Sequence, residues 1–131
     1  MHLRLLLILL PLIAITIPGL AQNHARFSDI KPGMVNRELE YAGVREANKK
    51  AAQLGCREEY TQATITSASW ELFYEDGELL GRKIHMEVYG RTWEGQCGVT
   101  HFLFRQKYLG HHEYAKLKCD EINDFYTLEC E

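Results

Sequence analysis

The hydrophobic period of the chain changes once, near Tyr60, and this change limits the fold more than any other feature of the sequence. Before Tyr60, apolar residues recur every three or four positions, which is typical of an amphipathic helix. After it, apolar and polar residues alternate, which is typical of strands with one buried face. The sequence therefore predicts one helix followed by a sheet.

The helix is expected in the stretch MVNRELEYAGVREANKKAAQLG, residues 34–55. Its apolar positions are Val35, Leu39, Ala42, Ala47, Ala51 and Leu54. Gly55 is predicted to end the helix, because glycine is the usual residue just past a helix C-terminus. Gly43 in the middle costs up to ~1 kcal/mol relative to alanine, which indicates close packing or a local bulge at that position.

Four strands are expected after the helix, at residues 61–74, 83–90, 98–106 and 112–119. The second strand puts Ile84, Met86 and Val88 on one face. Its opposite face, predicted to meet solvent, carries Lys83, His85, Glu87 and Tyr89. Phe102 and Phe104 are expected to point inward from the third strand, and Ala115, Leu117 and Cys119 from the fourth.

Short turns are predicted between these strands, at Asp76–Gly77, Trp93–Gly95 and Lys107–Gly110. Short connections make sequential strands antiparallel neighbours. The helix is the one large apolar element available to cover the apolar face of such a sheet. The expected fold is α+β, a single domain with one long helix across an antiparallel meander of four to five strands.

The chain opens MHLRLLLILLPLIAITIPGLAQ, with one basic residue, an apolar run, and the small residues Gly19 and Ala21 before Gln22. This pattern predicts a secretory signal peptide at residues 1–21, and the run is too short for a comfortable membrane span. The folded domain is then expected at residues 22–131, about the length of one ordinary domain. We expect a secreted, extracellular protein.

Charge and cysteine content narrow the classes of partner and the redox compartment. The net charge is −3 and no lysine or arginine run is longer than two residues, so neither nucleic acid nor an anionic membrane is expected as a partner. The four cysteines, Cys56, Cys97, Cys119 and Cys130, predict two disulfides in a secreted chain. Their spacing leaves all three pairings open.

No motif predicts an enzyme, a metal site or a cofactor. His111 and His112 are adjacent in the last expected hairpin, and adjacent residues of a strand point to opposite faces, which disfavours a shared metal ion. His85 and His101 lie on different strands and could approach each other, but no carboxylate is expected to complete a catalytic pair. Ser67 and Ser69 lack the nucleophile elbow that an activated serine needs.

Several segments together resemble the secreted cystatins, the inhibitors of papain-like cysteine proteases. The helix residues 39–49 are similar to the helix signature of that family, with one residue added. Residues 88–92 resemble the end of its third strand. Cys97 and Cys119 are similar in spacing to its C-terminal disulfide, and Gly110 stands nine residues before Cys119. The resemblance covers roughly residues 30–120 and implies a cystatin-like fold.

The resemblance implies reversible inhibition of papain-like cysteine proteases by a wedge that occludes the active-site cleft. The wedge would combine an N-terminal glycine, a first hairpin at residues 77–81 and a second hairpin at residues 107–110. The implied protease-contact residues are Gly33, Gly77, Leu79, Leu80, Gly81, Tyr108, Leu109 and Gly110. The implied disulfide Cys97–Cys119 would leave Cys56 to pair with Cys130.

The chain departs from the family at both hairpins. Gly77 stands at the glutamine position of the first hairpin, Tyr108 takes the place of the tryptophan in the second, and the proline is absent. The alternative function is a non-inhibitory secreted binding module that retains the scaffold. Leu79 and Leu80 have two interpretations as well, because they either contact a partner or pack under the helix. The oligomeric state is expected to be a monomer or a domain-swapped dimer.

Overall fold

A computed structural model describes residues 25–131 of the chain, and the predicted signal peptide lies outside these residues. The elements are η2 (Phe27–Asp29), α1 (Arg37–Gln53), β1 (Glu59–Ile65), β2 (Glu71–Glu75), β3 (Glu78–Arg91), β4 (Cys97–Gly110), β5 (Glu113–Tyr114) and β6 (Lys118–Thr127). The prediction of an α+β fold with one helix on an antiparallel sheet is confirmed. The sheet has six strands, two of them short, where four to five were predicted.

Helix α1 begins and ends at residues whose local chemistry favours those boundaries. The Asn36 side chain accepts a hydrogen bond from the backbone N–H of Leu39 at 3.1 Å and caps the N-terminus. Gly55 follows the C-cap with a φ of +69°, the left-handed conformation that glycine adopts at little cost. Val35 and Leu54, predicted as apolar helix positions, lie just outside α1 and are exposed.

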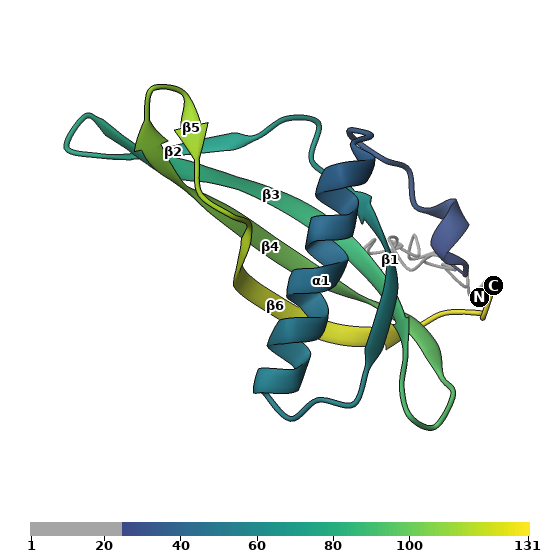
Figure 1. Cartoon of the computed structure of the whole chain (residues 1–131). Helices are drawn as coiled ribbons and strands as arrows, with labels where there is room; N and C mark the ends of the chain where they lie inside the picture. Colours follow the sequence, from purple (N-terminus) through teal and green to yellow (C-terminus); the bar gives the residue numbers. More distant parts are fainter. Residues whose placement is uncertain (1–24) are drawn as a thin grey trace, which may run out of the picture.

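The long strands form an antiparallel meander in the order β1, β3, β4 and β6 (Figure 1). Strand β2 pairs with the first half of β3, and β5 pairs with the end of β4. Helix α1 crosses one face of this sheet (Figure 1). The two hairpins that contain β2 and β5 extend beyond the part of the sheet that α1 covers (Figure 1).

The main core lies between α1 and the sheet. Its fully buried strand residues are Ile65, Ile84, Met86, Val88, Phe102 and Phe104. Gly43 of α1 is buried, and a Cβ atom at this position would lie 2.5 Å from the sulfur of Met86. The close packing predicted from this glycine is confirmed.

The single strand predicted for residues 61–74 is wrong, because the chain leaves the sheet between Ile65 and Glu71. The backbone N–H of His85 donates to the Ser67 hydroxyl oxygen at 2.8 Å, so a side chain replaces the backbone acceptor at this point of the ladder. Gly33 also donates its N–H to the Ile65 carbonyl at 2.9 Å. Strands β1 and β2 therefore pair separately with the same strand, β3.

The predicted turn at Lys107–Gly110 and the predicted strand at residues 112–119 are also wrong. Strand β4 continues to Gly110, and the chain reverses at His111 and His112, which both have positive φ, 53° and 63°. Two consecutive left-handed residues are typical of a tight hairpin turn. Strand β5 is only two residues long, and the longer pairing with β4 is made by β6.

A second hydrophobic cluster lies on the face of the sheet opposite to α1. It consists of Phe27, Ile30, Tyr89, Cys97 and Val99, with Tyr126 and Leu128 packed against it. Tyr89 was predicted to meet solvent, but the N-terminal segment covers it and its ring lies 5.3 Å from the ring of Phe27. The prediction that one face of the sheet is buried and the other exposed to solvent therefore holds only where the chain termini do not cover the sheet.

The disulfide of the folded chain joins Cys97, at the start of β4, to Cys130 in the C-terminal tail. Cys56 and Cys119 are free thiols. The implied pairs Cys97–Cys119 and Cys56–Cys130 are both wrong. The reason is that β6 runs past Cys119 to Thr127, where it pairs with Gly98, and this pairing brings the tail rather than Cys119 to Cys97.

We expect two of the four cysteines to react with iodoacetamide in the unreduced native protein. Cys56 is exposed, whereas burial raises the pKa of the half-buried Cys119 thiol and lowers its thiolate fraction. Cys56 should therefore be alkylated faster than Cys119. Peptide mass mapping after timed labelling measures both rates, and labelling of Cys97 or Cys130 without reductant would contradict the pairing.

Candidate functional site

Two neighbouring hairpins form the end of the molecule where most of the predicted contact residues lie. The first hairpin joins β2 to β3 through a turn at Asp76 and Gly77, and the second joins β4 to β5 through His111 and His112. Strands β3 and β4 remain paired as far as Gly81 and Lys107. The hairpins therefore leave the sheet side by side at the same end (Figure 1).

Each hairpin has a β-bulge close behind its turn, and each bulge places a leucine outside the regular pairing. In the first hairpin the register shift leaves Leu80 between the paired residues Leu79 and Gly81. In the second, Leu109 lies between Tyr108 and Gly110. Bulges redirect side chains that a regular ladder would place on a fixed face.

Half of the exposed large apolar side chains of the described chain lie on the two hairpins. Eight large hydrophobic residues of the described chain are exposed, and four of them lie here: Leu72, Tyr74, Leu80 and Leu109. We call these four residues the hairpin edge. Leu79 is half-buried, and neither Leu79 nor Leu80 belongs to either hydrophobic cluster of residues 25–131. The interpretation that these leucines pack under the helix is wrong.

The other predicted contact residues have different environments. Gly77 is exposed in the first turn, while Tyr108 and Gly110 are half-buried in the second hairpin. Gly81 is buried, and a Cβ atom there would lie 2.7 Å from the ring of Phe73 and 2.4 Å from the Gln106 carbonyl oxygen. Gly81 therefore allows Phe73 to pack across β3 and is not part of the exposed edge.

Gly33 lies far from the two turns. It packs against the backbone of Thr66 and Ser67 and bonds to Ile65, which pairs with Met86 of β3. Between Met86 and Gly77 the extended chain covers roughly 25–30 Å. The structure thus brings the two hairpins together and leaves Gly33 apart.

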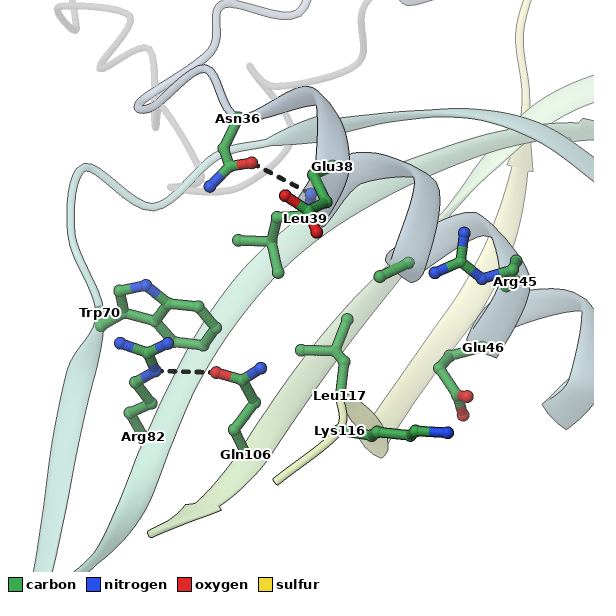
Figure 2. A pocket seen from close by; sticks show the side chains of 11 residues that line it. Asn36, Glu38, Leu39, Arg45, Glu46, Trp70, Arg82, Gln106, Lys116 and Leu117 are labelled. Carbon is green, nitrogen blue, oxygen red and sulfur yellow. Dashed lines mark hydrogen bonds between the residues drawn. The ribbon is translucent and has the colours of Figure 1, made fainter. Parts of the chain in front are cut away.

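A groove of about 460 Å³ lies between the start of α1 and the base of the hairpins (Figure 2). Leu39, Ala42 and Leu117 contribute its apolar wall, and Arg45, Glu46 and Lys116 contribute charges. At its other side, Arg82 donates from Nε to Oε1 of Gln106 at 2.8 Å, below the indole of Trp70 (Figure 2). The groove therefore reaches the base of the hairpins and has a polar rim, but none of the four residues of the hairpin edge lines it.

Three titratable side chains form a hydrogen-bonded chain on the face of the sheet opposite to α1. Nδ1 of His101 lies 2.9 Å from Oε1 of Glu87, and Nε2 of His101 lies 2.8 Å from Nδ1 of His85. A carboxylate accepts only, so a neutral His101 donates from Nδ1 to Glu87 and accepts at Nε2 from His85. The free Nε2 of a neutral His85 is then an acceptor.

The sequence did not indicate that Glu87 lies beside these histidines. Glu87 and His101 are direct partners across β3 and β4, and His85 lies two residues from Glu87 on the same face. The alternation of His85 and Glu87 was visible in the sequence, but the register that places His101 beside them was not. The nearby Ser67 hydroxyl accepts from the backbone of His85, not from its ring, so the contacts do not form a serine triad.

We expect the stability of the protein to fall as the pH rises from 10 to about 12, partly because of Tyr126. Burial, and then the Glu87 charge, raise the pKa of Tyr126 to about 12. The unfolded chain releases this proton near pH 10, so above that pH the folded state binds more protons and loses stability. Urea unfolding at several pH values measures the effect. Tyr126→Phe should flatten the slope in this window, and an unchanged slope would contradict the assignment.

Within residues 25–131, no cluster of three or more histidine, cysteine, aspartate or glutamate side chains is suited to bind a metal ion. The same residues contain no helix that is long and apolar enough to cross a membrane. Comparisons with protein-family models, with curated proteins and with solved structures find no match for this chain.

Proposed function

We propose that this protein is a reversible inhibitor of papain-like cysteine proteases that inserts its hairpin edge into the active-site cleft. The observation that supports the proposal is the concentration of exposed apolar side chains on two adjacent hairpins. Apolar side chains that enter a cleft each contribute binding energy at about 25 cal/mol per Å² of buried area. The remaining support is the resemblance of residues 30–120 to cystatins.

This mode of action needs no catalytic chemistry in the inhibitor. The leucines of the two bulges, Leu80 and Leu109, would act as anchors, with Tyr74 and Leu72 burying further area. Rigid hairpins limit the entropy lost on binding, since the turns at Asp76–Gly77 and His111–His112 are already formed. The inhibitor would exclude substrate by occupying the cleft.

An extracellular location is part of the proposal. The disulfide Cys97–Cys130 supports it, because structural disulfides persist mainly in oxidising compartments. The basic start and apolar run of residues 1–21 support it independently. Expression in a secreting cell should yield a chain that begins at Gln22, and an intact N-terminus on the secreted protein would contradict the proposed cleavage.

The second candidate function is a non-inhibitory binding module that uses the same edge on another protein. The position of Gly33 favours it, because a three-part wedge needs this glycine beside the hairpin turns. Gly33 lies instead beside Thr66 and Ser67, and roughly 25–30 Å of extended chain along β3 separates this region from the first turn. In this case the two hairpins alone would determine the partner.

Titration of papain and related lysosomal proteases with the oxidised chain, residues 22–131, separates the two functions. We expect reversible inhibition with a nanomolar constant, which corresponds to about −12 kcal/mol of binding free energy. Heat-unfolded and reduced protein is the control for non-specific effects. Absence of inhibition at micromolar concentration would reject the inhibitor and leave the binding module.

A further inference from the structure

Arg82 contacts aromatic rings from both hairpins. Its guanidinium carbon lies 4.0 Å from the ring centroid of Trp70, which directly precedes β2, and 3.8 Å from that of Tyr114 in β5. Two rings at such distances do not fit on one face of a planar guanidinium, so the group lies between them. Arginine suits this position because it stacks on aromatic faces, which lysine does not do in the same way.

The same side chain is also tied to β4. Its Nε donates to Oε1 of Gln106 at 2.8 Å (Figure 2). Arg82 itself belongs to β3, so one side chain connects the segments of β2, β3, β4 and β5. Burial lowers the pKa of Arg82, in keeping with a guanidinium enclosed by rings.

The contacts of Tyr114 continue to the second turn. Its ring lies 5.2 Å from the ring of Tyr108, and the Tyr108 hydroxyl accepts from the backbone N–H of His112 at 3.2 Å. Leu109 lies between these residues in the chain. The position of Leu109 is therefore linked to Arg82 through two tyrosines.

The pairing of β4 with β3 ends at Lys107, so it fixes the base of the second hairpin and not the part beyond that residue. Strand β5 has two residues, and a short isolated strand pair is marginal in water. Beyond the register pairs Tyr108–Tyr114 and Gly110–Glu113, the backbone bond from Ala115 to Lys107 at 2.8 Å closes the hairpin. These bonds hold β5 to β4 but do not hold the hairpin to β2 and β3.

We propose that Arg82 is a positioning residue that holds the two hairpins in one orientation, so that Leu80 and Leu109 form a single binding edge. The use of that edge rests on the proposed function, whereas the orientation of the hairpins does not. Loss of the contacts of Arg82 with the two rings should leave the core between α1 and the sheet intact, because neither Arg82 nor Tyr114 belongs to that core.

Two pairs of variants test the positioning role. Arg82→Met removes the planar cation, and Arg82→Lys keeps the charge without the fork. Tyr114→Leu removes the ring, and Tyr114→Phe keeps it. Arg105→Met is the matched control. Arg105 pairs with Lys83 across the ladder, lies 3.5 Å from Asp120, and is one residue from Gln106.

The first measurement is ¹⁵N relaxation of the free protein. In the wild type, Tyr114→Phe and Arg105→Met, backbone order parameters at residues 108–115 should match the rigid value of about 0.85. In Arg82→Met, Arg82→Lys and Tyr114→Leu they should fall toward about 0.6, while those of α1 stay unchanged. Wild-type order in both Arg82→Met and Tyr114→Leu would overturn the positioning role.

The second measurement is the inhibition constant for papain. Each loosening variant should raise it about tenfold, because the hairpins must then be ordered on binding, and the two controls should not. Inhibition that stays at the wild-type level in a loosened variant would overturn the link between orientation and binding. If the wild type does not inhibit at all, the proposed function fails and the relaxation data alone decide the role of Arg82.

Discussion

Replacing Cys130 by serine should lower the free energy of unfolding by about 3–4 kcal/mol, the amount that the loss of a loop-closing crosslink predicts for this spacing. The disulfide joins residues 33 positions apart. It also holds the tail in place, where Leu128 donates to the Cys97 carbonyl and Glu129 to that of Ala25, both through the backbone. The melting temperature should fall by roughly 15–25 °C, as measured by calorimetry.

Cys130 is a better position than Cys97 for removing the disulfide, and Cys56→Ser is the control. Cys130 is exposed, whereas Cys97 is buried, so serine at position 130 adds no buried hydroxyl. Cys56→Ser replaces an exposed free thiol and should change stability by less than about 0.5 kcal/mol. A loss of several kcal/mol in Cys56→Ser instead would mean that Cys56 is crosslinked in the folded protein.

The double variant Leu80→Asp, Leu109→Asp should weaken protease inhibition by about 100-fold or more. Each leucine would lose its apolar contact, and each aspartate would bring an unpaired charge into the cleft. A tenfold loss at each position corresponds to about 1.4 kcal/mol. The inhibition constant at fixed pH and ionic strength measures the change.

Stability separates a binding role of these leucines from a structural one. Both side chains are exposed, at 37% for Leu80 and 57% for Leu109, so the melting temperature of the double variant should stay close to that of the wild type. Leu54→Asp is the matched control. Leu54 is 59% exposed at the C-terminal end of α1, so this variant should leave inhibition unchanged. A large loss of stability in the double variant would assign the leucines to packing.

The helix and the main strands were predictable because their signals are local. The apolar spacing through Ala47 and Ala51 lies within the helix itself, and Gly55 lies within a few residues of the helix end that it determines. The alternation around Ile84 and Met86 likewise depends on neighbouring residues. The interruption between β1 and β2 was harder to predict. The end of β1 depends on a hydrogen bond from His85 to Ser67, and these residues are eighteen positions apart.

The candidate site was predictable in part. The sequence indicated that Leu79, Leu80 and Leu109 lie near hairpin turns, and they do, but it placed the second turn too early. The bulges at Leu80 and Leu109 were not predictable, because a bulge depends on the register of the partner strand. The role of Arg82 gave no local signal, since Trp70 and Tyr114 lie 12 and 32 positions away in the chain.

The sequence alone determined the class of the fold, the single α-helix of the described chain and the inward faces of β3 and β4, because hydrophobic periodicity acts over a few residues. Tertiary structure alone decided which cysteines pair, which carboxylate meets His101, and how far Gly33 lies from the hairpins. These features depend on strand register, and a shift of one residue moves every side chain of a strand to the other face. Such a choice is made by the packing of the whole sheet, where Thr127 meets Gly98 and brings Cys130 to Cys97.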